Sequence, residues 1–305
     1  MERSEYIWLD GEFVPWEAAR VHVLTHTLHY GLGVFEGVRC YEGADGRSAI
    51  FRLREHTERL FASAHILGIE IPFDREQIDA ACIETVRRNR LKACYIRPLV
   101  FLGEGEMGLA ATGNAVRVAV AVWPWGSYLG EQGVQRGIRV KTSSFQRVPV
   151  NALMSKAKAV GHYVNSILAA VEVRRNGYDE ALMLDADGFV AECSGENIFI
   201  VKNRKVKTTP LTSILPGITR DTVMTLLEDD GVACREERFT RDEVYIADEA
   251  FLTGTAAEVT PIRELDDRRI GDGTPGPVTT AVQAAYRRVT RGEDRKHGHW
   301  LATIP

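Results

Sequence analysis

Two lysines, Lys156 and Lys158, lie in a segment of mostly small residues just before a predicted helix at about residues 162–175. The helix is predicted because four apolar residues recur on one face at helical spacing, namely Val164, Ile167, Leu168 and Val171. A lysine at the start of a helix lies near the positive end of the helix dipole, which disfavours its ammonium form. A neutral lysine amine can form a Schiff base with a carbonyl compound, although two solvated surface lysines would give the same pattern.

A carboxylate and two turns could complete a site for such a lysine. Glu192 lies in a predicted strand, and residues 213–221 predict a loop and a helix start that present Gly217 and Thr219. Residues 252–256 repeat the pattern after another predicted strand. Free backbone N–H groups at a helix start bind anions, so both turns are candidate phosphate sites, although many helices begin in this way.

Two arginines are candidate anion-binding side chains in the first half of the chain. Arg97 shares one face of a predicted strand at residues 93–101 with Tyr95. An arginine in an otherwise apolar strand is costly to bury unless an anion pairs with it. Arg59 lies on a predicted helix at residues 54–67, where an exposed position is expected. The residues alone therefore favour Arg97 over Arg59.

Together these parts match the requirements of pyridoxal 5'-phosphate, which are an imine-forming lysine, an acidic partner for the pyridine nitrogen and an anion site. The carboxylate keeps the ring nitrogen protonated, so that the ring accepts the electrons left when a substrate loses its α-proton. The lysine amine can then carry that proton as general base and acid.

Three histidines allow a different interpretation. His22, His26 and His29 could share one helical face and bind a metal ion, as in a metal-dependent hydrolase. No carboxylate joins them, however, and residues 21–24 are equally typical of a strand. This alternative stays open at this point.

Three glycines, Gly31, Gly33 and Gly37, suggest a dinucleotide-binding turn. The last gap is one residue too long for that motif, and a strand is predicted after it where the motif needs a helix. A nicotinamide-dependent enzyme is therefore excluded.

Composition describes an ordinary globular protein. The chain has 305 residues, of which 45% are hydrophobic and 26% charged, enough for one large or two ordinary domains. A net charge of -4 gives no reason to expect nucleic acid or a membrane as partner, and neither a signal peptide nor a membrane-spanning run is predicted. Five scattered cysteines without a Cys-x-x-Cys pair favour reduced thiols and a cytoplasmic location.

The chain resembles the fold-type IV pyridoxal-phosphate enzymes, and among them the bacterial branched-chain amino acid aminotransferases. The matching motifs span nearly the whole length, at residues 28–31, 34–39, 54–60, 95–98, 192–197, 215–220 and 254–258. The resemblance implies an α/β (α+β) fold with a smaller N-terminal domain at residues 1–124, a linker at 125–137 and a larger C-terminal domain at 138–305, with the cofactor between the two domains.

The resemblance also assigns the cofactor residues. It makes Lys158 the imine-forming catalytic lysine and leaves Lys156 a solvated neighbour. Glu192 would contact the pyridine nitrogen, Leu215 the ring and Tyr163 the phenolic oxygen. The phosphate would be held by Arg59, Ile218, Thr219 and Thr255, and the further cofactor-binding residues are Gly217 and Gly254.

Substrate residues follow from the same resemblance. Tyr95 and the Thr255–Ala256 backbone would bind the α-carboxylate, and Arg97 with Tyr30 and Tyr128 the distal carboxylate of glutamate. The remaining substrate positions are Phe35, Gly37, Arg39, Met107 and Trp125. The implied reaction moves the amino group of leucine, isoleucine or valine to 2-oxoglutarate in a homo-oligomer, a dimer at least or a hexamer, in which Tyr30 and the loop around Met107 reach a second subunit.

Three residues depart from the family pattern, Val160, His162 and Cys193. The resemblance places them next to the surroundings of the cofactor, so they bear on the breadth of substrates more than on the type of reaction. A D-amino acid or (R)-amine transaminase of the same fold is therefore the alternative function.

Overall fold

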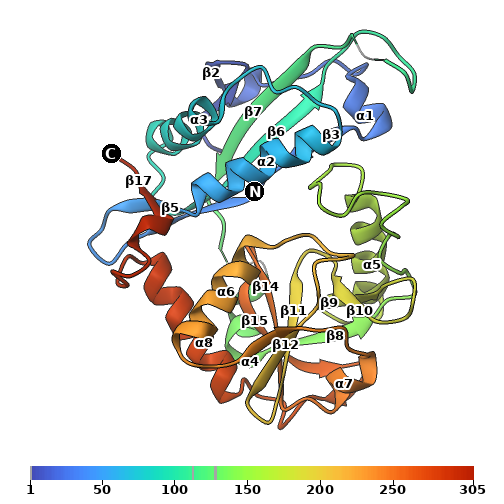
Figure 1. Ribbon diagram of the computed structural model, residues 1–305. Helices are drawn as coiled ribbons and strands as arrows, with labels where there is room; N and C mark the ends of the chain where they lie inside the picture. The colour runs from blue at the N-terminus through green and yellow to red at the C-terminus, as the bar shows by residue number, and fades with distance from the viewer. Residues whose placement is uncertain (1, 112, 127–128) are drawn as a thin grey trace. The chain divides into compact units, whose positions relative to one another are not determined.

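The structure is a computed structural model that describes residues 2–111, 113–126 and 129–305, and the chain divides into two compact units (Figure 1). The first unit contains the residues up to Trp125 together with Ala157–His162 and Val289–Pro305. The second contains Gly126–Lys156 and Tyr163–Arg288. The predicted domain limits stay a prediction. The first unit includes two segments from later in the sequence, because each of them pairs with strands of that unit.

The first unit is built on an eight-stranded antiparallel sheet with the order β17-β5-β4-β6-β7-β1-β2, in which β3 also pairs with β6. Its strands are β1 (Tyr6–Leu9), β2 (Glu12–Pro15), β3 (Gly33–Phe35), β4 (Val38–Glu42), β5 (Ser48–Phe51), β6 (Cys94–Leu102), β7 (Val116–Trp123) and β17 (Leu301–Thr303). The predicted hairpin at residues 6–14 is confirmed as β1 and β2. Its turn residues, Asp10 and Gly11, have φ values of 51° and 98°, as a tight hairpin requires.

Two long helices, α2 (Leu53–Ile66) and α3 (Arg75–Arg88), lie together on one face of this sheet (Figure 1). Leu60 and Ala64 of α2 are buried in the core, as predicted. The predicted apolar side of α3 is also buried, comprising Ile78, Ala81, Cys82, Thr85 and Val86. The short helices of the unit are η1 (Trp16–Ala18), α1 (His26–Tyr30) and η2 (Gly298–Trp300).

The second unit contains a nine-stranded mixed sheet with the order β10-β9-β8-β15-β14-β11-β12-β13, to which β16 adds beside β15. Its strands are β8 (Ile138–Thr142), β9 (Glu180–Leu184), β10 (Val190–Cys193), β11 (Asn197–Lys202), β12 (Lys205–Thr208), β13 (Cys234–Glu236), β14 (Glu249–Gly254), β15 (Glu258–Leu265) and β16 (Arg268–Arg269). Its helices are α4 (Gly130–Arg136), α5 (Tyr163–Arg175), α6 (Ile218–Asp229), α7 (Arg241–Tyr245) and most of α8 (Pro277–Thr290). No helix of the described residues is long and apolar enough to cross a bilayer.

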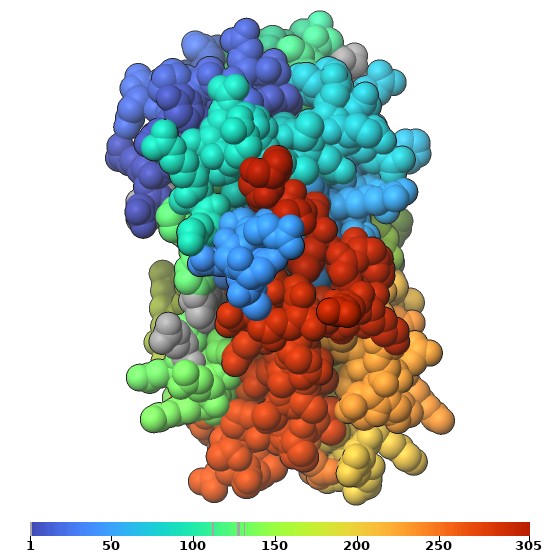
Figure 2. Space-filling model, turned by 90° about the vertical axis from the view of Figure 1, so that its left-hand side faces the viewer, coloured from blue at the N-terminus to red at the C-terminus, as the bar shows by residue number. Residues whose placement is uncertain are grey.

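The C-terminal segment completes the first sheet. β17 pairs antiparallel with β5, and the Ala44 amide donates to the Arg291 carbonyl at 3.0 Å. Figure 2 shows these C-terminal residues, in dark red, beside the blue residues around β5. The edge of β5 is therefore covered by a strand from the far end of the sequence.

The helix predicted at residues 162–175 is confirmed as α5, but its apolar face does not point inward. The residues buried on α5 are Ser166, Ala169 and Val173. The predicted stripe is exposed instead, with Val164 at 60%, Ile167 at 57%, Leu168 at 45% and Val171 at 41%. A contiguous apolar stripe on a surface helix is typical of a protein interface.

Candidate active site

Lys158 lies in an extended segment of the first unit that pairs with β3. The Phe35 amide donates to the Lys158 carbonyl at 3.1 Å, and Val34 and Ala159 form an isolated antiparallel bridge. The Ser63 hydroxyl of α2 accepts from the Lys158 amide at 3.0 Å. The flanking alanines are small because this segment packs directly against β3, and the Lys158 amine lies 5.2 Å from the centre of the Phe35 ring.

Lys158 precedes a helix, as predicted, but it does not lie at the helix start itself. α5 begins at Tyr163, five residues later, and the intervening amides of Val160 and Gly161 donate to the carbonyls of Gly33 and Gly31. The residues that follow Lys158 therefore run as an extended segment alongside β3 of the first sheet. A helix dipole therefore does not act on this amine in the way proposed from the sequence.

Lys156 is not a solvated neighbour. Its amine donates to the carbonyls of Leu211 and, at 3.0 Å, of Ile214, which belong to the second unit as Lys156 does. Burial lowers the pKa of Lys156. The side chain thus ties the lysine segment to the loop that leads into the predicted phosphate turn at Gly217.

Arg97 lies in an aromatic surrounding on β6. Its guanidinium is 4.7 Å from the centre of the Phe35 ring, 5.4 Å from Tyr95 and 5.7 Å from Trp123. Among the described residues no group accepts a hydrogen bond from its buried Nε. A cation so placed on ring faces is ready for an anionic ligand, which agrees with the sequence argument.

Tyr95 is surrounded closely by other predicted substrate residues. The Trp125 ring centre lies 4.4 Å from that of Tyr95, and Arg39 of β4 is its direct cross-strand partner. A Cβ on Gly37 would lie 1.8 Å from the Tyr95 hydroxyl oxygen. The Tyr95 side chain can therefore adopt this conformation only because residue 37 has no side chain.

Arg59 is not an exposed helix arginine. Its side chain is only 11% exposed, and it forms an ion pair with Glu36, at 2.7 Å from Nε to the carboxylate. Glu36 in turn accepts from His56 at 2.7 Å. Neither Glu36 nor His56 was assigned a role from the sequence, because single charged residues in an apolar segment do not reveal their partners.

Glu192 is buried in β10 of the second unit and carries an ion pair with Arg147 at 2.8 Å. Its other oxygen accepts from the Asn197 side chain at 3.1 Å and from the Leu215 amide at 3.3 Å. A bulge in β10 interrupts the pairing with β9 beside Glu192 and re-aims this stretch of strand. Arg147 and Asn197 were missed because they lie far from Glu192 or in another strand.

The first predicted phosphate turn is confirmed as a helix start. α6 begins at Ile218 after Gly217, and no side chain caps it. Ile218 and Thr219 are buried. A Cβ on Gly217 would lie 2.0 Å from the Asn197 side-chain oxygen, so the backbone approaches closely there. Uncapped amides and a buried hydroxyl make this end of α6 suitable for a phosphate.

The second predicted phosphate turn is not a helix start. Gly254 ends β14, and β15 begins at Glu258, so residues 255–257 form a turn between two antiparallel strands. The Thr253 hydroxyl beside it is buried without a hydrogen-bond partner among the described residues. A Cβ on Gly254 would lie 3.1 Å from the Glu196 side chain. The turn still presents Thr255 and Ala256, but without a helix dipole.

Three other predicted residues are not buried in the core. Tyr30 ends α1 and Met107 lies in a loop, and both are exposed. Tyr163 begins α5 and is half-buried. Tyr128 falls outside the residues that the structure describes. The exposed tyrosine and methionine are consistent with side chains that meet a second copy of the chain.

The structure does not bring the three histidines together as a metal site. His26 bonds the Gly108 carbonyl at 2.9 Å, His29 bonds the Val23 carbonyl at 2.8 Å, and His22 accepts from its own turn. Residues 21–24 are not a strand. No group of three histidine, cysteine or acidic side chains suited to a metal occurs among the described residues.

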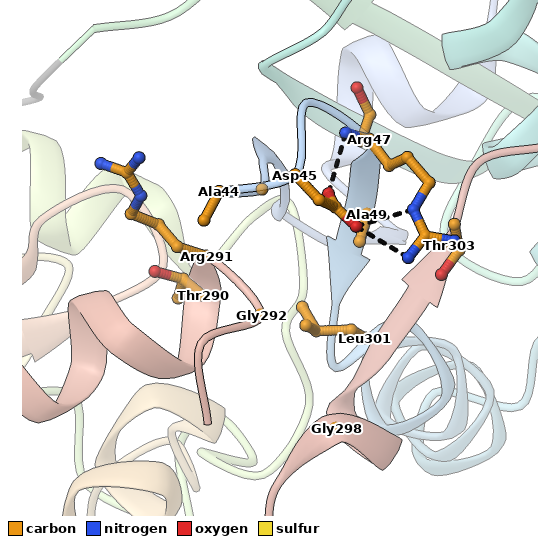
Figure 3. Close-up of a pocket in the computed structure, with 12 residues that line it drawn as sticks. Ala44, Asp45, Arg47, Ala49, Thr290, Arg291, Gly292, Gly298, Leu301 and Thr303 are labelled. Atoms are coloured by element: carbon orange, nitrogen blue, oxygen red, sulfur yellow. Dashed lines mark hydrogen bonds and ion pairs between the residues drawn. The ribbon is translucent and has the colours of Figure 1, made fainter. Parts of the chain in front are cut away.

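A surface recess of about 240 Å³ lies between β5 and the C-terminal segment (Figure 3). Arg47 and Asp45 form an ion pair at its side, at 2.7 Å. Its lining includes Thr290, Leu301 and Thr303, and none of the predicted site residues. The recess lies where β17 pairs with β5.

Comparisons with known proteins agree with this geometry. The family model of amino-transferase class IV matches residues 33–265. The branched-chain-amino-acid aminotransferase of Pseudomonas aeruginosa is 55% identical over 99% of this chain and 98% of its own length, and that of Escherichia coli K12 is 43% identical over 99% and 98%. The chain belongs to the class IV aminotransferases.

Solved class IV aminotransferases share the fold of the whole chain. A branched-chain amino acid aminotransferase from T.th., solved with pyridoxamine 5'-phosphate, is 46% identical, with a TM-score of 0.97 and complete coverage of both chains. The Escherichia coli enzyme has the same TM-score at 42% identity, with 99% of this chain and 100% of its own covered. The predicted fold-type IV α/β (α+β) class and the predicted aminotransferase family are therefore confirmed.

Two buried carboxyls of the second unit were also missed by the sequence. Burial raises the pKa of Glu180, and burial together with the charge of Glu180 raises the pKa of Glu196 well above its usual range. Glu180 accepts from the amides of Ala181 at 2.7 Å and Ser194 at 3.1 Å. Glu192 differs from both in its direct ion pair with Arg147, at 2.8 Å.

Proposed function

We propose that this class IV aminotransferase transfers the amino group of L-leucine, L-isoleucine or L-valine to 2-oxoglutarate with pyridoxal 5'-phosphate as cofactor. The observation that carries the proposal is Arg97, a cation on the faces of aromatic rings. Rings alone suit a branched apolar side chain, and the guanidinium suits the distal carboxylate of glutamate. One surface thus offers contacts to both substrates of the reaction.

The cofactor residues are assigned from the fit of this structure to a phosphate and a pyridine ring. The uncapped start of α6, with Thr219, would hold the phosphate, and Arg59 would add a guanidinium. Glu192, paired with Arg147, would accept a hydrogen bond from the protonated pyridine nitrogen of the cofactor. Leu215, whose amide bonds Glu192, would pack on the ring.

When bound, pyridoxal 5'-phosphate supplies an electron-accepting ring for the bond that breaks at the substrate α-carbon. The Lys158 amine would take the α-proton and return it to a different carbon, acting as general base and then acid. Pairing with β3 holds the Lys158 backbone in place. Tyr95, whose hydroxyl is accommodated by Gly37, would orient the α-carboxylate.

We infer further that the enzyme is a cytoplasmic homo-oligomer, a dimer at least. The exposed apolar stripe of α5 supports a second copy as partner, since a globular enzyme rarely exposes four aligned aliphatic residues. All five cysteines are free thiols in the structure, which suits a reducing compartment.

A panel of amino donors with 2-oxoglutarate tests the substrate. We expect L-leucine, L-isoleucine and L-valine to react and D-alanine and (R)-amines to react far more slowly. Equal rates with L-leucine and D-alanine would favour the alternative, a D-amino acid or (R)-amine transaminase. The visible absorbance of the purified protein checks the cofactor in the same samples.

A further inference from the structure

Glu36 is a carboxylate without solvent exposure in the turn between β3 and β4 of the first unit. It accepts from Arg59 at both oxygens, at 2.7 Å from Nε and 2.9 Å from Nη2. It also accepts from His56 Nδ1 at 2.7 Å and from the Gly37 amide at 3.2 Å. Four donors thus converge on one buried carboxylate.

Burial and the neighbouring charged groups determine the protonation of Glu36 and His56. Burial alone would raise the pKa of Glu36, but Arg59 and His56 outweigh burial and hold that pKa well below its usual range. Burial lowers the pKa of His56 below 6.5 in spite of Glu36. His56 is therefore neutral near pH 7, and because an ionised carboxylate only accepts, His56 Nδ1 carries the proton that it donates to Glu36.

The two-point contact fixes the plane of the Arg59 guanidinium. Side-by-side N–H···O bonds between an arginine and a carboxylate define both the direction and the rotation of the fork, which a single bond would not. His56, one turn earlier on α2, holds the carboxylate from another side. The guanidinium therefore has one orientation on the helix.

Stability alone does not account for this cluster. Buried ion pairs seldom stabilise a fold more than apolar residues of similar volume would, because the charges must be desolvated. The cluster also lies close to the reactive segment, since Lys158 is among the charges that act on His56 and its amide bonds Ser63 on the same helix. His56, Arg59 and Ser63 follow each other at three and four residues, so they share one face of α2.

We propose that Glu36 and His56 are positioning residues that orient the Arg59 guanidinium toward the phosphate of the cofactor. This inference rests on the proposed function, in which Arg59 binds that phosphate. Neither residue touches the reacting atoms. Their effect is to aim a cation that would otherwise adopt several rotamers, and so to reduce the ordering cost of phosphate binding.

The experiment compares the affinity of the cofactor-free protein for pyridoxal 5'-phosphate and for pyridoxal, which lacks the phosphate. Glu36→Gln keeps the shape of the side chain but loses the charge and one acceptor. We expect the affinity for pyridoxal 5'-phosphate to fall on the order of tenfold, as for coupled neighbouring groups, and the affinity for pyridoxal to stay unchanged. The phosphorus NMR shift of the bound phosphate should move as well.

Glu42→Gln on the adjoining strand β4 is the matched control. Glu42 forms an exposed ion pair with Lys92 at 2.8 Å, so the chemical change is the same in a place without the cluster. It should alter neither affinity. A double variant with Arg59→Met tests whether Glu36 acts through Arg59. Glu36→Gln should have no further effect on the affinity once the guanidinium is gone.

An unchanged affinity of Glu36→Gln for pyridoxal 5'-phosphate, an equal loss for pyridoxal, or additive effects with Arg59→Met would overturn the proposal. If Glu36→Gln does not fold, His56→Leu serves instead, with the same selective loss expected and an unselective or absent loss contradicting us. A wild-type protein that binds no pyridoxal 5'-phosphate would refute the proposed function itself, whereas a binding wild type with an unaffected Glu36→Gln would refute only this inference.

Discussion

Lys156 donates a hydrogen bond to the Ile214 carbonyl at 3.0 Å, across 58 positions of the chain. Lys158, two residues later, instead pairs by its backbone with Phe35. The two lysines that look alike in the sequence therefore have different surroundings, and their substitutions should have different results.

Lys158→Met should abolish the visible absorbance of the covalently held cofactor and lower kcat by at least about a thousandfold, because both the anchor and the proton carrier are lost. Lys156→Met is the matched control and should keep the absorbance at saturating cofactor. Absorbance spectra and single-turnover rates of the two variants decide this. If Lys158→Met kept the chromophore, the assignment of the lysine would be wrong.

Lys156→Met should loosen the loop at residues 211–214, because two backbone carbonyls lose their charged donor. Each bond to a charged group contributes about 1.5–3 kcal/mol. Hydrogen exchange should therefore increase in peptides that cover this loop, while β6 keeps its protection. Unchanged exchange in the loop would show that Lys156 does not hold it.

Arg97→Met should separate the two substrates. Loss of a charged hydrogen-bonding group should lower kcat/KM for L-glutamate by roughly tenfold to a hundredfold. The value for L-leucine should change by less than about threefold, since an aliphatic substrate needs no charge partner. Arg117→Met is the control, because Arg117 also lies over a ring, that of Phe101, but is paired with Asp10. An equal loss for both substrates would contradict the role of Arg97.

Glu196→Gln should alter the dependence of stability on pH. The pKa of Glu196 is raised above its usual 4.5 in the folded protein, first by burial and then by Glu180. The folded state therefore holds a proton that the unfolded state releases, so this contribution is complete below pH 4.5 and declines as the pH rises toward the folded pKa. A glutamine does not titrate, so the stability of Glu196→Gln relative to the wild type should grow as the pH rises above 4.5.

Thermal unfolding from about pH 4 to about pH 9 measures this difference. Glu228→Gln, on the exposed side of α6, makes the same chemical change at the surface and should leave the profile as it is. Parallel profiles for the wild type and Glu196→Gln would contradict a neutral Glu196.

Ile167→Asp should lower the oligomeric mass of the protein in dilute solution, because a charge in the centre of an apolar interface is costly to bury. Ile246→Asp provides the control, since Ile246 is an exposed isoleucine outside α5. Light scattering coupled to size exclusion distinguishes the two. A wild-type mass for Ile167→Asp would exclude the α5 stripe as the subunit contact.

Sequence periodicity predicted most elements because local packing determines them. The α3 residues Ile78, Cys82 and Val86 are buried as their spacing indicates. α5 was predicted in the right place, but spacing does not distinguish an inward apolar face from one that meets another molecule. Its small buried residues, Ser166 and Ala169, gave little signal.

The sequence did not reveal partners that come from distant parts of the chain. The Glu36–Arg59 pair spans 23 positions, and the Glu192–Arg147 pair joins β10 to a residue outside the helices and strands. The turn after β14 was mistaken for a helix start, because glycine and threonine are common to both. The family resemblance supplied roles that the residues alone left undecided, as for Lys156 and Lys158.

Strand β17 has a consequence for how the protein is made. The edge of β5 stays open until residues 301–303 have left the ribosome, and an open edge is a template for pairing with other chains. The sheet of the first unit therefore gains its last strand only when these late residues are made, and the contacts between β17 and β5 have large sequence separation. Nascent or truncated chains that lack residues 301–303 should accumulate as aggregates during synthesis, and chaperone demand should fall once β17 is made and paired.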